Sequence, residues 1–262
     1  MRQKFVAGNW KMNTNADEAE RLARAVADGV GTEHGVRIAI CPPFPYLALV
    51  AKILKGSNVA LGAQNLFPAR EGAFTGEVSP AMLIDLGCRY VILGHSERRH
   101  VLGESDTFIN KKVEVALASG LDVILCVGET LAQREADQTK MVLDRQLIEG
   151  LVGLAAVNLS HLSIAYEPVW AIGGQGQHAT PQQAEEASAL IRDRFAQIFD
   201  RNSAHALTIQ YGGSVNPENA ADFLAQKEVD GVLIGGASLH ADEFLAIVRA
   251  GICHSQTEAE SK

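Results

Sequence analysis

Eight short apolar segments recur along the chain, and longer stretches of mixed polar and apolar residues separate them. Most of the eight are continuously apolar rather than alternating, which is typical of parallel strands that are covered on both faces. The pattern therefore predicts eight buried strands, at 5–7, 37–41, 58–61, 90–93, 123–127, 163–166, 207–211 and 231–234.

Helical patterns fill the stretches between the predicted strands. Asn15 and Glu18 have the spacing of a capping box, in which each side chain bonds the other residue's backbone N–H. Thr180 and Gln183 repeat this spacing around Pro181, a residue favoured in the first helical turn. The apolar faces predicted for these two helices and for the last one are Ala19, Leu22, Ala23 and Val26, then Ala184, Ala187, Ile191, Phe195 and Ile198, and finally Ala241, Phe244, Leu245 and Val248.

The alternation of strands and helices predicts the fold class. A further helix start at Asn216–Pro217 completes the pattern in a chain of 262 residues. Eight alternations favour a single α/β domain built as a (β/α)8 barrel, for which about 250 residues is typical. An open doubly wound sheet is the alternative, although no G-x-G-x-x-G turn follows the first predicted strand. We place the barrel at residues 1–253 and expect the polar end, 254–262, to be a frayed tail.

Composition narrows the function classes. The chain is 47% hydrophobic and 21% charged, with a formal net charge of −8, which argues against a general binder of nucleic acid or membrane surfaces. No apolar run approaches the roughly 20 residues that span a bilayer, and Asn9 and Lys11 interrupt the N-terminal one too early for a signal peptide. The four cysteines form no C-x-x-C pair, so we expect reduced thiols in a cytoplasmic protein rather than disulfides or a zinc site.

Chemically unusual residues follow three of the predicted strands. Asn9 and Lys11 follow the first strand, His95 follows the fourth and Glu167 follows the sixth. In both α/β arrangements functional groups gather at the carboxyl ends of the strands. A carboxylate, an imidazole and an ammonium in one pocket suit proton abstraction next to a carbonyl. Taken singly, each has a plainer explanation as a solvated lysine, a helix cap or half of an ion pair.

Two glycine-rich segments follow the last two strands, at 211–215 and 235–238. Glycine lets backbone N–H groups approach a phosphate closely, and these two loops form the usual phosphate site of such barrels. Ordinary tight turns are the alternative.

A third glycine-rich segment, 171–179, begins four residues after Glu167 and has the composition of a mobile lid. A plain flexible loop is the alternative.

Five motifs in order resemble the triosephosphate isomerase family along almost the whole chain. They are Ala7 to Asn13, Gly94 to Arg99, Ala165 to Gly173, Tyr211 to Val215 and Gly235 to Leu239. The resemblance implies interconversion of dihydroxyacetone phosphate and glyceraldehyde 3-phosphate through an enediolate, a step of glycolysis and gluconeogenesis.

The resemblance also implies a role for each site residue. Glu167 would be the base and His95 the electrophile, which in this family is a neutral imidazole at a helix N-terminus. Lys11 would stabilise charge and Asn9 would orient the substrate. The phosphate would rest on backbone N–H groups of Gly173, Ser214, Gly235 and Gly236. No metal or organic cofactor is implied.

A homodimer is implied as well. Residues 74–77 match the family's third loop, which projects into the partner subunit. A connection as long as 64–79 is uncommon in a compact domain unless it has a function.

One segment departs from the family: Gly174 to His178 makes the lid one residue longer and removes its usual lysine. Two alternatives to this isomerase are another phosphosugar barrel enzyme and a barrel without activity that serves as a scaffold. Neither would be expected to keep Lys11, His95 and Glu167 together.

Overall fold

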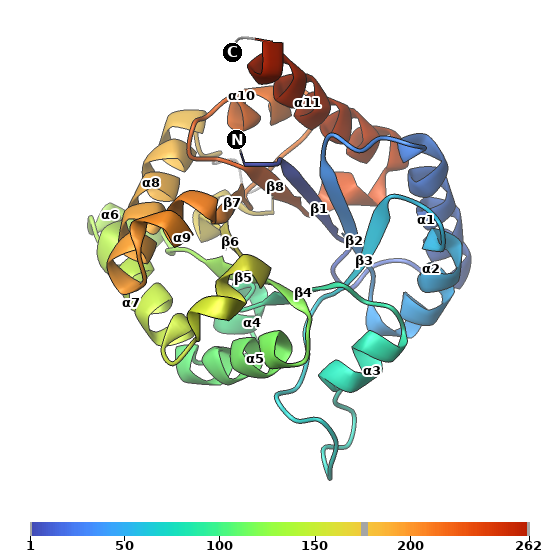
Figure 1. The fold of residues 1–262 in the computed structure, drawn as a ribbon, viewed down its shortest axis with the longest axis horizontal. Helices are drawn as coiled ribbons and strands as arrows, with labels where there is room; N and C mark the ends of the chain where they lie inside the picture. Colours follow the sequence, from blue (N-terminus) through green and yellow to red (C-terminus); the bar gives the residue numbers. More distant parts are fainter. Residues whose placement is uncertain (1, 174–177, 261–262) are drawn as a thin grey trace.

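The computed structural model describes residues 2–173 and 178–260. Its centre is a closed barrel of eight parallel strands in sequence order, and helices form a ring around it (Figure 1). The strands are β1 (Phe5–Asn9), β2 (Arg37–Cys41), β3 (Val59–Ala63), β4 (Tyr90–Leu93), β5 (Asp122–Val127), β6 (Leu162–Tyr166), β7 (Thr208–Tyr211) and β8 (Gly231–Ile234).

Pairing of the first and last strands closes the barrel. β1 lies parallel to β8, with Phe5 opposite Gly231, and parallel to β2, with Phe5 opposite Arg37. The predicted barrel is therefore confirmed, and the open doubly wound sheet is wrong. All eight predicted strands form, with ends that shift by at most two residues; β1, for example, continues to Asn9.

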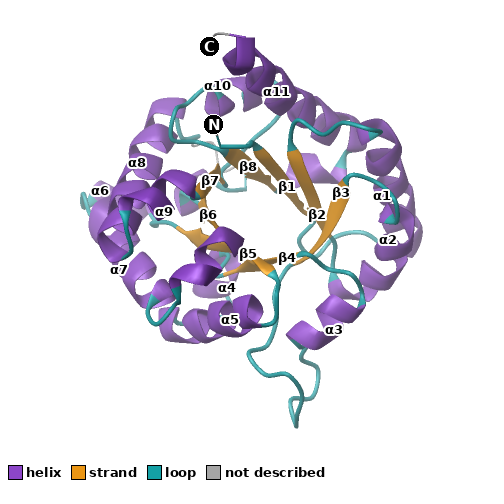
Figure 2. Cartoon of the chain, in the orientation of Figure 1, coloured by secondary structure: helices purple, strands orange, loops and turns teal. Residues whose placement is uncertain are grey.

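The helices run around the outside of the strands (Figure 2). The α-helices are α1 (Ala16–Val30), α2 (Leu47–Leu54), α3 (Pro80–Asp85), α4 (Ser96–His100), α5 (Asp106–Ala118), α6 (Leu131–Glu135), α7 (Thr139–Leu151), α8 (Pro181–Ile198), α9 (Arg201–Ala206), α10 (Ala220–Leu224) and α11 (Ala241–Glu260). Four short 3-10 helices add η1 (Phe44–Tyr46), η2 (Ala156–His161), η3 (Val169–Ala171) and η4 (Gly236–Leu239) in the described residues.

Both predicted capping boxes are present. The Asn15 side chain accepts from the Glu18 N–H at 3.0 Å, and Glu18 accepts from the Asn15 N–H at 2.9 Å. Thr180 and Gln183 exchange the same pair of bonds at the start of α8. These bonds satisfy backbone donors that the first turn of a helix otherwise leaves without partners.

The strands send side chains into two apolar layers. Val6 packs in the layer between strands and helices, whereas Phe5 and Ala7 pack inside the barrel. Alternation of side chains across the sheet produces this division, and it explains why both faces of each strand are apolar. A barrel filled in this way is rigid and holds the strand ends in place for chemistry.

Three sequence expectations differ from the structure. The helix predicted at Asn216–Pro217 is assigned only from Ala220. Asn216 and Asn219 do bond each other's backbone N–H as in a capping box, but residues 217–219 form a turn that leads into the helix. Ile198 is only partly buried at the end of α8. The last helix continues to Glu260, so most of the expected tail is helical; the barrel boundary at 253 stays a prediction.

The connection 64–79 between β3 and α3 projects away from the barrel (Figure 1). Its tip is exposed, and the Phe67 and Phe74 rings pack on each other with centroids 4.3 Å apart. Cys41, Cys88 and Cys126 are free and buried, as expected. No helix in the described part of the chain is long and apolar enough to cross a membrane.

Candidate active site

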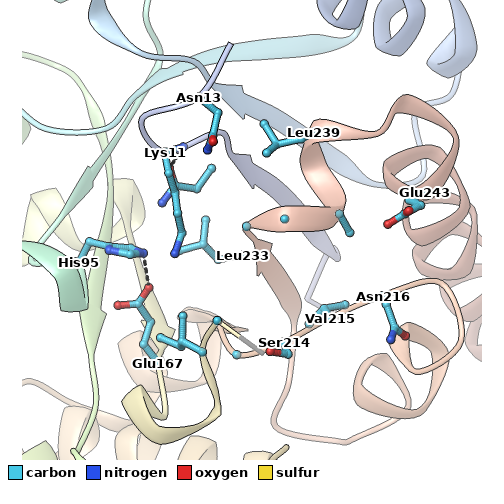
Figure 3. A pocket seen from close by; sticks show the side chains of 18 residues that line it. Lys11, Asn13, His95, Glu167, Ser214, Val215, Asn216, Leu233, Leu239 and Glu243 are labelled. Atoms are coloured by element: carbon cyan, nitrogen blue, oxygen red, sulfur yellow. Dashed lines mark hydrogen bonds and ion pairs between the residues drawn. The ribbon is translucent and has the colours of Figure 1, made fainter. Parts of the chain in front are cut away.

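A cavity of about 360 Å³ opens at the carboxyl ends of the strands (Figure 3). Every site residue named from the sequence lines it, although they come from the ends of five different strands and the loops that follow them. The eight residues are Asn9, Lys11, His95, Glu167, Gly173, Ser214, Gly235 and Gly236. A barrel explains the convergence, because all of its strands end at the same rim.

Glu167 lies directly after β6 and is almost fully buried, with 2% of its surface exposed. Its Oε1 is 2.9 Å from Nε2 of His95, and its Oε2 accepts the Ser96 backbone N–H at 2.8 Å (Figure 3). Two glycines make room for it: a Cβ on Gly128 would meet the Glu167 backbone, and one on Gly212 would meet its side chain. The carboxylate is therefore held in place by both contacts and packing.

Opposing effects act on the pKa of Glu167. Burial raises it, but the His95 side chain and the Ser96 N–H stabilise the carboxylate more, so the pKa lies below its usual value. The side chain is thus ionised near neutral pH, as a base must be.

His95 is the N-cap of α4 and is also buried. Burial lowers the pKa of its imidazole, but the Glu167 carboxylate raises it, and the net change is upward. Nδ1 faces the Glu97 backbone N–H at 3.3 Å, which leaves Nε2 as the nitrogen that carries the proton. A neutral imidazole with its proton on Nε2 satisfies both contacts and can donate a hydrogen bond into the cavity.

Lys11 stands in a left-handed backbone conformation, with φ of 52°, that few non-glycine residues adopt. The Asn9 side chain accepts its N–H at 3.0 Å, and the Gln64 amide donates to its carbonyl at 2.8 Å. Gln64 also donates to the carbonyl of Cys41, at 2.9 Å, which ties the turn to β2. The Lys11 ammonium is 2.6 Å from Glu97 and points across the cavity toward His95 (Figure 3).

The glycine turns line the opposite wall of the cavity. A Cβ on Gly236 or Gly173 would meet nothing within 4 Å, so both backbones face open space. The backbone N–H and the hydroxyl of Ser214 donate instead to the carbonyl of Ala171, at 3.1 and 2.9 Å. In this arrangement the Ser214 N–H already has a partner, and it would have to leave Ala171 to bind a phosphate.

The chain matches a family model described as triosephosphate isomerase over residues 4–251. The chain belongs to the triosephosphate isomerase family. It is 52% identical to the triosephosphate isomerase of Carboxydothermus hydrogenoformans over 96% of this chain and 100% of that protein. Those of Thiobacillus denitrificans and Rhodopirellula baltica are 51% and 49% identical, each over 95% of this chain and at least 98% of the relative. The family predicted from the five motifs is therefore confirmed.

Sequence reasoning missed two polar residues that support this triosephosphate isomerase site. Gln64 directly follows β3, and Glu129 follows β5 by two residues. Glu129 is fully buried and accepts from the Tyr166 hydroxyl at 3.1 Å and from the Trp170 indole at 2.9 Å. Both lie at strand ends, so the signal that singled out His95 would have found them had it been applied to every strand.

Two further expectations bear on the cavity rim. Of the lid segment from Gly174 to His178, residues 174–177 lie outside the described part of the chain. Among the residues that the structure describes, no group of three or more histidine, cysteine or acidic side chains could hold a metal ion. The absence of a cofactor stays a prediction.

Proposed function

We propose that this cavity interconverts dihydroxyacetone phosphate and glyceraldehyde 3-phosphate by proton transfer through an enediolate. Membership of the triosephosphate isomerase family makes the chain an aldose–ketose isomerase of triose phosphates, so the barrel without activity is set aside. The observation that carries the mechanism is the buried carboxylate of Glu167, 2.9 Å from the His95 imidazole, with the Lys11 ammonium beside them (Figure 3).

Glu167 is the base in this proposal. Its carboxylate takes a proton from the carbon next to the substrate carbonyl, and the electron pair forms the C=C bond of the enediolate. The proton of the adjacent hydroxyl group moves to the other oxygen of the enediolate, Glu167 returns its proton to the former carbonyl carbon, and the isomeric triose results. For this transfer the carboxylate has to give up its present bonds to His95 and Ser96.

His95 and Lys11 stabilise the charge that develops on the substrate oxygen. The Nε2–H of His95 donates to this oxygen, and the Lys11 ammonium lowers the energy of the negative intermediate. Asn9, only 5% exposed, holds the Lys11 turn through its side-chain oxygen and orients the substrate. When the Glu167 carboxylate leaves His95 to take the substrate proton, the contact that raises the pKa of the imidazole is lost, and the neutral form can donate its Nε2–H to the substrate oxygen.

Backbone N–H groups of Gly173, Ser214, Gly235 and Gly236 bind the phosphate in this proposal. All four residues line the cavity, and η4 begins at Gly236. Two of these glycines face open space, so a phosphate can come close to their backbone. The Ser214 N–H joins them when it releases Ala171.

We also propose that two copies of the chain form a homodimer in the cytoplasm. Met12, the residue after Lys11, is 95% exposed, and Phe74 in the projecting 64–79 connection is 45% exposed. Gln64 joins the two features, because it starts that connection and bonds the Lys11 turn. Large apolar side chains left open on projecting segments are typical of surfaces that another chain covers.

An isomerase assay coupled to oxidation or reduction of one triose by a dehydrogenase tests the activity and the base together. Glu167→Asp retracts the carboxylate by about 1 Å and is expected to lower kcat on the order of 100-fold. Glu149→Asp, an exposed position on α7, is the matched control and should leave kcat unchanged. A wild-type protein inactive with both trioses would contradict the activity, and full activity in Glu167→Asp would contradict the assigned base.

A further inference from the structure

A second carboxylate lies in the cavity at the end away from the chemistry. Glu243 lines the same cavity as Gly235 and Gly236, and it lies on the far side of their turn from His95 and Glu167 (Figure 3). Asn216 also lines this end of the cavity. The cavity thus extends past the proposed phosphate position and ends at an acidic side chain.

Among residues 2–173 and 178–252, whose side chains the structure describes, no ion pair or hydrogen bond neutralises Glu243. Asn216, which lines the same cavity, exchanges two bonds with Asn219. Lys11, the one lysine among the described residues that line the cavity, is paired with Glu97. The charge of Glu243 therefore faces whatever anion occupies the glycine turns.

An acidic residue in the first turn of a helix has an ordinary explanation, since the helix N-terminus favours negative charge. α11 carries two such residues in that turn, Asp242 and Glu243. Asp242 is exposed and lines a separate groove beside α1, outside the catalytic cavity. Asp242 alone can therefore supply the negative charge that the helix N-terminus favours. Of these two residues, only Glu243 lines the cavity where an anion would bind.

We propose that Glu243 is a specificity-determining residue that limits, by charge repulsion, how tightly the cavity holds an anionic group. This inference rests on the proposed phosphate position at Gly235 and Gly236. Two consequences follow from Coulomb repulsion across a solvent-filled cavity. The phosphate of the product is held less tightly and leaves more readily, and a ligand that carries a second anionic group beside the phosphate is rejected.

Inhibition by inorganic phosphate and by pyrophosphate tests the proposal, with Glu243→Gln compared against Asp242→Asn. Each variant removes one negative charge from the same helical turn. Glu243→Gln should lower the inhibition constant of phosphate about 3- to 10-fold at low ionic strength, and that of pyrophosphate by more. Asp242→Asn should change both constants less than 2-fold. Added salt should shrink the difference between the two variants, because salt screens the repulsion.

Equal constants in the two variants, or a weaker binding of phosphate in Glu243→Gln, would overturn the inference. Calorimetric titration of phosphate into each protein measures binding without any turnover. A wild-type protein that binds phosphate but isomerises neither triose would contradict the proposed function, while the comparison of variants would still decide the role of Glu243. A wild-type protein that isomerises both trioses, with two indistinguishable variants, would contradict the inference alone.

Discussion

At the scale of single residues, the site depends on a lysine held in an unfavourable backbone conformation. The left-handed φ of 52° at Lys11 costs about 1 to 2 kcal/mol in a residue with a side chain. Asn9 and Gln64 hold this turn from either side, at the N–H and at the carbonyl of Lys11. Strain of this kind at a functional position fixes the direction of the side chain.

Gln64→Glu is expected to loosen this turn, because a carboxylate of the same size cannot donate to the Lys11 and Cys41 carbonyls. We expect kcat/KM to fall about 10-fold or more, since small displacements of a catalytic group cost large factors in rate. Gln226→Glu is the matched control, because Gln226 also donates to a backbone carbonyl but on the surface, at Asp222. Steady-state kinetics and circular dichroism of both variants measure the effect, and equal kcat/KM values would show that the Gln64 bonds do not position Lys11.

At the scale of secondary-structure elements, the sequence predicted the barrel well because strand burial leaves a simple signature. A strand covered on both faces is continuously apolar, and most of the eight predicted segments have this form. The difference at Asn216 concerns the boundary of the helix: the cap predicted there is present, as reciprocal bonds with Asn219, but the residues that follow it form a turn before α10 begins at Ala220. Gln64 and Glu129 also lie at strand ends, so their positions could have been predicted, but their partners from other strands could not.

The link between α4 and α5 holds a cluster of paired charges. Glu104 lies in the connection between them, accepts from Arg98 at 2.7 Å and is paired with Lys112. Lys112 is buried and also donates to Asn65 at 2.8 Å. Burial raises the pKa of Glu104, but its bonds to Arg98 and Lys112 lower it more, so the net pKa is below the usual value.

This depressed pKa predicts a loss of stability in acid. The folded protein binds fewer protons at Glu104 than the unfolded chain does. The contribution of Glu104 to the free energy of unfolding is therefore present above the unfolded pKa of about 4.3, and it is lost as the pH falls through the lower pKa of the folded state. Glu104→Gln should remove this part of the pH dependence between about pH 5 and 3. It should also cost about 3 to 5 kcal/mol of unfolding free energy at pH 7, because Lys112 would be left buried without its carboxylate.

Urea unfolding at a series of pH values, at one protein concentration, measures both effects. Glu20→Gln is the control, because Glu20 pairs with Arg24 on an exposed face of α1 and should contribute less than about 1 kcal/mol. If Glu104→Gln lost stability in acid as steeply as the wild type, Glu104 would not carry the proton linkage.

At the scale of the whole molecule, a single chain leaves large apolar side chains near its active site exposed to solvent. Met12 is exposed directly beside the strained Lys11, and the 64–79 connection projects from the same region through Gln64 (Figure 1). Stable dimers bury about 1,600 Å² in total, an area to which a projecting connection of this size can contribute substantially. A partner that covers Met12 would restrain the Lys11 turn from outside, so assembly and activity are expected to be coupled.

Thr75→Arg places a long charged side chain at the exposed tip of this connection and should separate the proposed dimer without disturbing the fold of one chain. We expect the wild type to sediment at twice the 28.0 kDa chain mass and the variant to shift toward the mass of a single chain. The kcat of the variant should fall on the order of 10-fold or more, because the Lys11 turn loosens. Val157→Arg, at an exposed position in η2, is the control and should change neither property. A monomeric wild type with full activity would refute both the dimer and its coupling to catalysis. A monomeric but fully active Thr75→Arg would refute the coupling alone, because Asn9 and Gln64 would then hold the Lys11 turn without help from a second chain.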